Sequence, residues 1–140
     1  MLMRVSGRFE NVFPLGFEIQ GHVEEVLCLL ARMILELQKD PEYPGFLRMV
    51  VADSRRLPWI AEEFAAVMDP LSDLLARYLA RLTAMGVLNC RNPLLAAHQY
   101  MGALNEFSLW PWMIGRETLP VPAEEIVKET MRMFLRHYRR

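Results

Sequence analysis

Apolar residues recur every three or four positions along most of the chain, and this spacing constrains the fold more than any other feature. The clearest run is Leu71, Leu74, Leu75, Tyr78, Leu79, Leu82 and Met85, which stops at Gly86. Residues at this spacing share one face of a helix, whereas a half-buried strand alternates apolar and polar residues. No segment of the sequence alternates in that way. The sequence therefore predicts an all-α domain.

Proline, glycine and Asp or Asn residues divide this pattern into about six helices, which short connections would join in an antiparallel helical bundle. The predicted helices cover residues 22–37, 46–56, 59–68, 71–85 and 93–113, and the last begins at Pro122. Pro70 is expected to separate the third from the fourth, because a proline inside a helix removes a hydrogen bond and clashes with the preceding turn. Pro111 is expected to kink or end the fifth helix near Trp110 for the same reason.

The first 21 residues lack a clean period. Apolar side chains there are interrupted by Pro14, Gly16 and Gly21, which indicates an irregular apolar leader over residues 1–21. The helical period starts at His22, so residues 22–140 are predicted to form one helical domain.

The composition limits where the apolar residues can lie. Hydrophobic residues make up 53% of the 140 residues, above the usual average, yet no uninterrupted apolar run approaches the length of a membrane span. The excess must therefore be hidden in a core, in a subunit interface or around an apolar ligand. Cys28 and Cys90 are far apart in the sequence, and the N-terminus has no apolar signal region, which favours a reduced, cytoplasmic protein with no membrane contact.

Three stretches, in this order, resemble the C-terminal ligand-binding and dimerisation domain of tetracycline-repressor-type (TetR-family) transcriptional regulators. They are FLRMVVADSRRLPWIAEEF (Phe46–Phe64), LLARYLARLTAMGVL (Leu74–Leu88) and NPLLAAHQYMGAL (Asn92–Leu104). The resemblance implies that residues 22–140 form a ligand-binding and dimerisation domain of antiparallel helices around a ligand cavity. It also implies a homodimer in which the last two helices, here Pro93–Met113 and Pro122–Tyr138, pair with their mates in a four-helix interface.

In that family a helix-turn-helix head precedes the domain and contacts DNA. Residues 1–21 are too short for such a head, and the net charge of −1 gives no basic footprint for nucleic acid. We therefore expect no DNA contact by this chain alone; in an intact relative, the head that is missing here would make it.

The fifth predicted helix is apolar on two sides. One stripe contains Leu94, Ala97, His98, Met101 and Asn105, and the other contains Ala96, Tyr100, Ala103, Phe107 and Trp110. A helix that is apolar on two sides is buried on two sides, and in a small domain the second side most economically faces a partner subunit. The residues predicted for the homodimer interface are Leu94, Ala97, Gly102, Asn105, Ile126, Thr130, Met133, Phe134 and His137.

Aromatic and methionine side chains supply the candidates for a ligand cavity, because flat rings and flexible thioethers suit a small apolar or aromatic effector. The predicted ligand-binding residues are Trp59, Tyr78, His98, Tyr100, Met101, Phe107 and Trp110. The alternative for the apolar residues is ordinary core packing, and for His98 a structural, hydrogen-bonded role.

Catalysis and metal binding have no support in the sequence. A Gly-rich phosphate loop, a nucleophile elbow and a paired-carboxylate signature are missing, and Cys28 has no recognisable base. His22 and Glu25 resemble half of a helical metal site, but His98 and His137 have no Glu at matching spacing. We therefore predict no catalytic residues, no metal and no cofactor. The predicted function is effector sensing and dimerisation in a TetR-like regulator; the alternative is an interaction protein that dimerises with itself or with a full-length relative and takes no ligand.

Overall fold

The structure is a computed structural model that describes residues 22–36, 39–116 and 118–140. Its helices are α2 (Val23–Glu36), α3 (Tyr43–Asp53), α4 (Pro58–Ala84), α5 (Pro93–Ser108), α6 (Trp110–Met113) and α7 (Ala123–Tyr138). Within these ranges the β-structure is limited to one isolated bridge between Leu88 and Arg139. The all-α prediction is confirmed, whereas the leader predicted over residues 1–21 lies outside the described residues.

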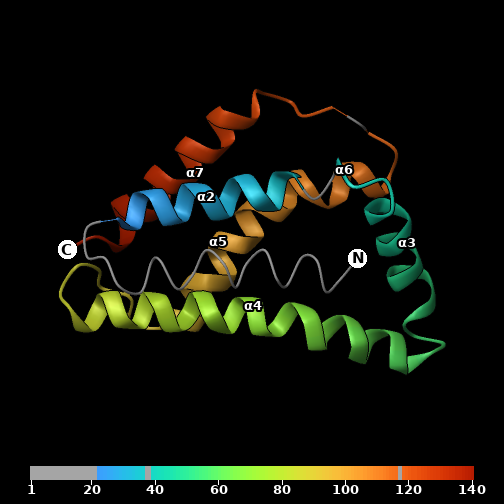
Figure 1. The fold of residues 1–140 in the computed structure, drawn as a ribbon, viewed down its shortest axis with the longest axis horizontal. Coiled ribbons are helices and arrows are strands. Elements are labelled where there is room, and N and C mark those ends of the chain that lie inside the picture. Colours follow the sequence, from blue (N-terminus) through green and yellow to red (C-terminus); the bar gives the residue numbers. More distant parts are fainter. Residues whose placement is uncertain (1–21, 37–38, 117) are drawn as a thin grey trace.

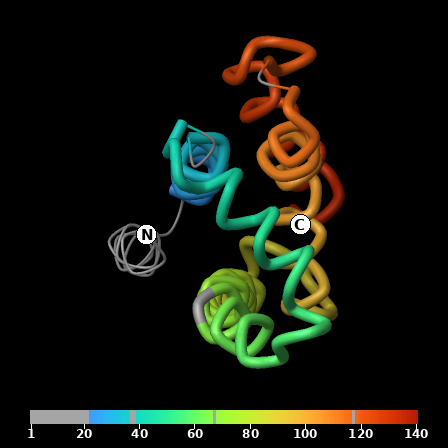
Figure 2. The backbone as a smooth tube through the Cα atoms, turned by 90° about the vertical axis from the view of Figure 1, so that its right-hand side faces the viewer, coloured from blue at the N-terminus to red at the C-terminus, as the bar shows by residue number. Residues whose placement is uncertain are grey.

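Helix α5 lies at the centre of the bundle. It contacts α2, α4, α6 and α7, and α7 also packs on α2. Figure 1 shows α2 and α4 running in opposite directions, with α5 crossing between them and α3 joining their ends. In the perpendicular view, α2 and α4 form one side of the molecule and α5, α6 and α7 the other (Figure 2). This central position explains why α5 is apolar around so much of its circumference.

The two helices predicted on either side of Pro70 are one helix, so the predicted break at this proline is wrong. α4 runs for 27 residues with Pro70 inside it. Pro70 has no N–H to donate to the carbonyl of Ala66, one turn earlier. Both residues are exposed, so water can bond to that carbonyl, while Ile60 and Leu71 on either side are buried. Burial on the inner face keeps the helix continuous.

The other predicted helix ends agree better with the structure. Asn92 caps α5, because its side chain accepts a 3.0 Å hydrogen bond from the backbone N–H of Leu95. α5 ends at Ser108, and Trp110 begins the short α6 with Pro111 in its first turn, as expected for a proline at this point. No helix in the described ranges is both long and apolar enough to cross a membrane.

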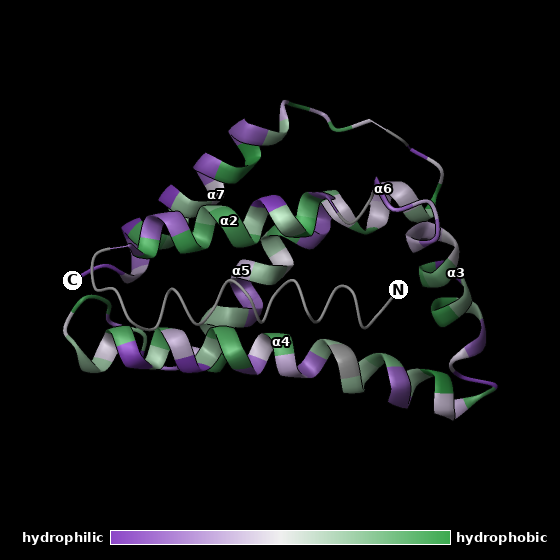
Figure 3. Ribbon diagram, viewed as in Figure 1, coloured by the Kyte–Doolittle hydropathy of each residue, from purple (hydrophilic) through white to green (hydrophobic). Residues whose placement is uncertain are grey.

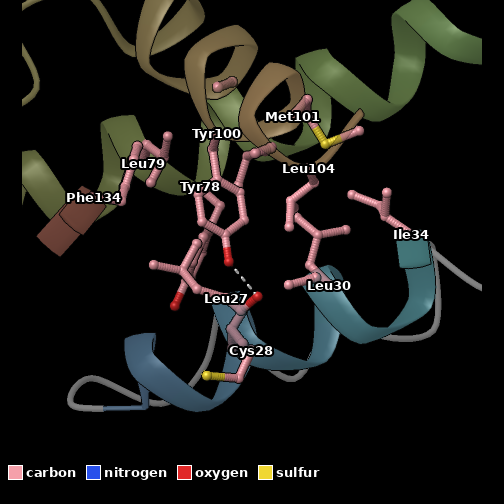
Figure 4. Close-up of a cluster of buried hydrophobic side chains, with 14 of the residues drawn as sticks. Leu27, Cys28, Leu30, Ile34, Tyr78, Leu79, Tyr100, Met101, Leu104 and Phe134 are labelled. Atoms are coloured by element: carbon pink, nitrogen blue, oxygen red, sulfur yellow. Dashed lines mark hydrogen bonds between the residues drawn. The ribbon is translucent and has the colours of Figure 1, made fainter. Parts of the chain in front are cut away.

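The hydrophobic core lies where α2, α4, α5 and α7 meet. Hydrophobic and hydrophilic residues follow one another along each of these helices (Figure 3). The largest fully buried side chains of the core include Leu27, Leu30, Leu75, Tyr78 and Tyr100. The Tyr100 ring lies between helices: its hydroxyl bonds to α2 at the Leu27 carbonyl oxygen, and its edge meets Phe134 of α7, with ring centroids 5.1 Å apart (Figure 4). These contacts fix α5 and α7 side by side and so position the candidate site.

Candidate functional site

A groove of about 300 Å³ runs between α5 and α7. Its lining residues are Gln99, Tyr100, Ala103, Thr130, Met133, Phe134, His137 and Tyr138. The Tyr138 hydroxyl donates to Oε1 of Gln99 and thereby joins the two helices across the groove. The ring of Tyr138 packs on Phe134 and His137, with centroids 4.7 and 4.6 Å away. The groove is therefore lined by aromatic side chains that pack against one another.

The two helices that form this groove also carry exposed apolar side chains. The Met133 side chain is 62% exposed, and Leu94 and Leu95 at the start of α5 are also exposed. Gly102 lies on the exposed side of α5, where an added Cβ would meet nothing within 4 Å. The protomer itself therefore gives no packing reason for a glycine at this position. A small residue there does leave room for another helix to approach closely.

The structure divides the residues predicted for the dimer interface into three groups. Leu94, Gly102, Met133 and His137 are exposed, and Asn105 is half-buried. Thr130 and Phe134 are buried and line the groove. Ala97 and Ile126 are buried in the core of the protomer. Because α5 is central, the side of this helix that contains Ala97 packs inside the protomer.

The residues predicted to bind ligand do not form one site. Tyr78, Tyr100 and Met101 are packed in the core, as Figure 4 shows. Burial raises the pKa of Tyr78 to about 12 and that of Tyr100 further, so both hydroxyls stay protonated above the pH at which an exposed tyrosine ionises. The remaining predicted residues are Phe107, which is half-buried, and Trp59, His98 and Trp110, which are exposed on three different helices.

A looser aromatic cluster lies at the end of the bundle where α3 contacts both α4 and α6. Here Phe46 and Phe64 pack with ring centroids 6.2 Å apart, and both remain partly exposed. Nε1 of Trp112 is buried, and among the described residues it has no hydrogen-bond partner. A buried indole N–H normally finds an acceptor. Neither Phe46 nor Trp112 was predicted, although the closely spaced Trp110 and Trp112 around Pro111 were a visible signal.

A second hollow, of about 760 Å³, follows the outer side of α7 and reaches the start of α2. Its charged lining residues are Glu24, Glu129, Arg132, Arg136, Arg139 and Arg140. Arg132 pairs with Glu129 at 2.6 Å, and Arg139 pairs with Glu24 at 2.9 Å. The lining of this hollow is therefore more polar than that of the groove on the α5 side of this helix.

The two cysteines and His22 show no feature of a catalytic or metal-binding site. Cys28 and Cys90 are buried, and burial raises the pKa of both thiols, which disfavours the nucleophilic thiolate. His22 Nε2 lies 3.8 Å from a Glu25 carboxylate oxygen in an exposed pair. Across the described ranges, no group of three or more His, Cys, Asp or Glu side chains could hold a metal ion.

Known proteins resemble this chain in sequence and in fold. The family described as AefR-like transcriptional repressor, C-terminal domain, matches residues 25–140. No curated protein matches the sequence. A TetR-family regulator from Mesorhizobium loti superposes with a TM-score of 0.82 at 19% identity, over 99% of this chain and 70% of its own. One from Pseudomonas syringae gives a TM-score of 0.67 at 21% identity, over 99% and 72%. The chain therefore belongs to the AefR-like C-terminal domain family of TetR-type transcriptional regulators, as its three ordered motifs indicated.

Proposed function

We propose that this domain dimerises and senses a small apolar or aromatic effector for a transcriptional regulator. The observation that carries the proposal is the surface of α5 and α7, where an aromatic groove lies beside exposed apolar side chains. Two copies related by a two-fold axis would place this surface against itself and form a four-helix interface. Membership of a family of transcriptional repressor domains supports the regulatory context.

The residues of this surface suit a helix-to-helix interface. Met133 and Leu95 are more than half exposed in the protomer, and pairing would remove them from water. Gly102 leaves space for the backbone of a partner helix. The groove next to Met133 offers a place for a side chain of the second copy, because a protruding residue on one subunit needs a hollow on the other.

Two charge-introducing variants test this assignment. Met133→Glu should convert a dimer into a monomer, because a carboxylate would be buried without a partner in the interface. Met49→Glu is the matched control, since Met49 is also exposed, at 41%, but lies on α3. Size-exclusion chromatography with light scattering gives the mass of each. Equal masses for the two variants would contradict the placement of the interface on α5 and α7.

We place the effector site at the aromatic end of the bundle, between α3, the first half of α4 and α6. The half-buried rings of Phe46, Phe64 and Phe107 supply an apolar lining, and the Trp112 N–H supplies a donor. A ligand that combines an aromatic or apolar body with one hydrogen-bond acceptor matches this set. Its binding would favour one packing of α6 against α3 and so bias the domain towards one conformation.

Tryptophan fluorescence and thermal shift with a panel of aromatic acids and apolar drugs test the effector site. A ligand that binds only the folded domain raises its melting temperature. Phe64→Ala should abolish this rise in melting temperature. Trp112→Phe should weaken the binding only of those ligands that carry a hydrogen-bond acceptor. Unchanged binding in both variants would exclude this site. A panel without any binder would favour the alternative of a ligand-free interaction protein.

A further inference from the structure

The hollow on the outer side of α7 lies at the other end of the bundle from the proposed effector site. Figure 1 shows the end of α7 beside the start of α2 at the end marked C, whereas α3 and α6 lie at the far end. The hollow has a volume of about 760 Å³, which is within the range of small-molecule sites. Neither the proposed dimer nor the proposed effector site accounts for its charged lining.

Cationic side chains outnumber acidic side chains around this hollow. The exposed charged residues are Glu24, Glu125 and Glu129 on one hand, and Lys128, Arg132, Arg136, Arg139 and Arg140 on the other. Arg136 and Arg140 line the hollow, and among the residues that the structure describes neither side chain has an ion-pair partner. Arg136 follows Arg132 by one turn of α7, so their guanidinium groups can reach the same ligand.

The other two guanidinium groups in the hollow are held by carboxylates. Nη1 of Arg132 donates to Glu129 at 2.6 Å, and Nη2 of Arg139 donates to Glu24 at 2.9 Å. A guanidinium has five N–H donors, so one such bond leaves the others free for a second acceptor. These pairs therefore limit the movement of two cations and leave most of their donors available.

The hollow also has an apolar part. Its lining includes Leu135, which is buried, Met131, which is half-buried, and Met133, which is 62% exposed. Flexible thioethers adapt to apolar groups of varied shape. A ligand with an apolar body would cover the two methionines and remove them from water, while its charged group reached the arginines.

We propose that this hollow binds an organic phosphate, that is, a compact anion with a phosphate group on an apolar body. Arg132 and Arg136 would donate to the phosphate oxygens, because the planar guanidinium fork matches phosphate in charge and in geometry. Met131 and Met133 would contact the apolar body. The site is separate from the proposed effector site and does not depend on the proposed dimer.

The exposure of the arginines favours phosphate over a single carboxylate. Water and salt screen an exposed charge, so one carboxylate would gain little there. A phosphate monoester carries about 1.5 to 2 negative charges at pH 7 and offers three acceptor oxygens to several donors at once. A long polyanion fits less well, because it would also pass the exposed carboxylates of Glu125 and Glu129.

Titration calorimetry of the whole chain with hexyl phosphate and with inorganic phosphate tests the site. Hexyl phosphate should bind at least ~10-fold more tightly, because its alkyl chain covers the methionines. Arg136→Gln should weaken the binding of hexyl phosphate at least ~10-fold, since it removes a charged donor. The Arg136 side chain is exposed, so this variant should keep the melting temperature of the wild type. Arg77→Gln is the matched control, because Arg77 is an exposed arginine within α4.

A soluble ester and the headgroup of a lipid can both present this phosphate, and vesicles separate the two sources. Cosedimentation with phosphatidylcholine vesicles that contain phosphatidic acid, lost in Arg136→Gln, would assign the site to lipid headgroups. Binding of hexyl phosphate without cosedimentation would assign it to soluble esters. The proposal is overturned if neither probe binds at millimolar concentration, or if Arg77→Gln weakens binding as much as Arg136→Gln does. Equal affinity for hexyl and inorganic phosphate would contradict the contact with the methionines.

Discussion

The hydroxyl of Tyr100 donates a 2.6 Å hydrogen bond to the carbonyl oxygen of Leu27. Both residues are fully buried, so this bond joins α5 to α2 in the middle of the core. A carbonyl inside a helix has a second lone pair, so the Leu27 oxygen can accept from the phenol as well as from the helix backbone. The sequence position of Tyr100 gave no indication that it would link these two helices.

Tyr100→Phe should lower the free energy of unfolding by about 1 kcal/mol, because it removes the buried bond and keeps the ring against Phe134. Urea denaturation followed by circular dichroism measures the change. Tyr138→Phe is the control: its hydroxyl bonds to Gln99 on the exposed side of the groove, where water can replace the lost partner. An equal loss of stability in the two variants would show that the hydrogen bond to Leu27 contributes no more than the exposed bond to Gln99.

Stability should fall steeply as the pH rises above about 10. Burial raises the pKa of Tyr43 and Tyr78 to about 12 and raises that of Tyr100 further. A raised pKa in the folded state means that the folded chain holds these protons after the unfolded chain has lost them. The stabilisation is complete below the usual value and is lost as the pH climbs towards the raised one. Tyrosinate absorbance should therefore appear together with unfolding; ionisation of all four tyrosines near pH 10 in the folded chain would contradict the burial.

Pro70→Ala should stabilise the domain by about 1–3 kcal/mol, because it restores a donor for the Ala66 carbonyl and relieves the clash inside α4. The side chain at this position is exposed, so the change removes no core contact. The melting temperature is the simplest measurement. A lower melting temperature would mean that α4 needs the bend that a proline favours.

Acid should selectively remove the contribution of Glu124, which ties the start of α7 to Arg32 of α2. Arg32 donates from Nε at 3.0 Å and from Nη2 at 2.9 Å, and these bonds lower the pKa of the Glu124 carboxyl. A lowered pKa gives stability that is present above the usual value and is lost as the pH falls through the lowered one. Glu124→Gln should therefore lower the melting temperature at pH 7, and the difference should vanish once the pH falls below the lowered pKa of the Glu124 carboxyl. Glu36→Gln is the control at pH 7: it removes only the exposed pair between Glu36 and Lys39 and should leave the melting temperature unchanged.

The helices could be predicted from the sequence because apolar spacing and capping residues act locally. Asn92, Pro93 and Pro111 mark helix ends that the structure confirms. Pro70 was misjudged because burial of Ile60 and Leu71, which is a tertiary effect, outweighs the local cost of the proline.

The candidate site was harder to predict, because periodicity shows that a side is apolar and does not show what covers it. Ala97 and Met133 both fit an interface by spacing, yet α5 buries Ala97 within the protomer and α7 leaves Met133 exposed. The two closely spaced tryptophans around Pro111 were visible in the sequence, but the burial of the Trp112 N–H is a tertiary effect that the sequence does not show. The expectation that these 140 residues alone make no DNA contact stays a prediction.

Sedimentation equilibrium of the unmodified chain tests the central claim most directly. We expect a single species of twice the 16.3 kDa chain mass at micromolar concentration, because the α5–α7 surface buries its apolar residues only when two copies meet. A mass of 16.3 kDa that persists up to about 100 µM, corresponding to association weaker than about −5.5 kcal/mol, would contradict the account.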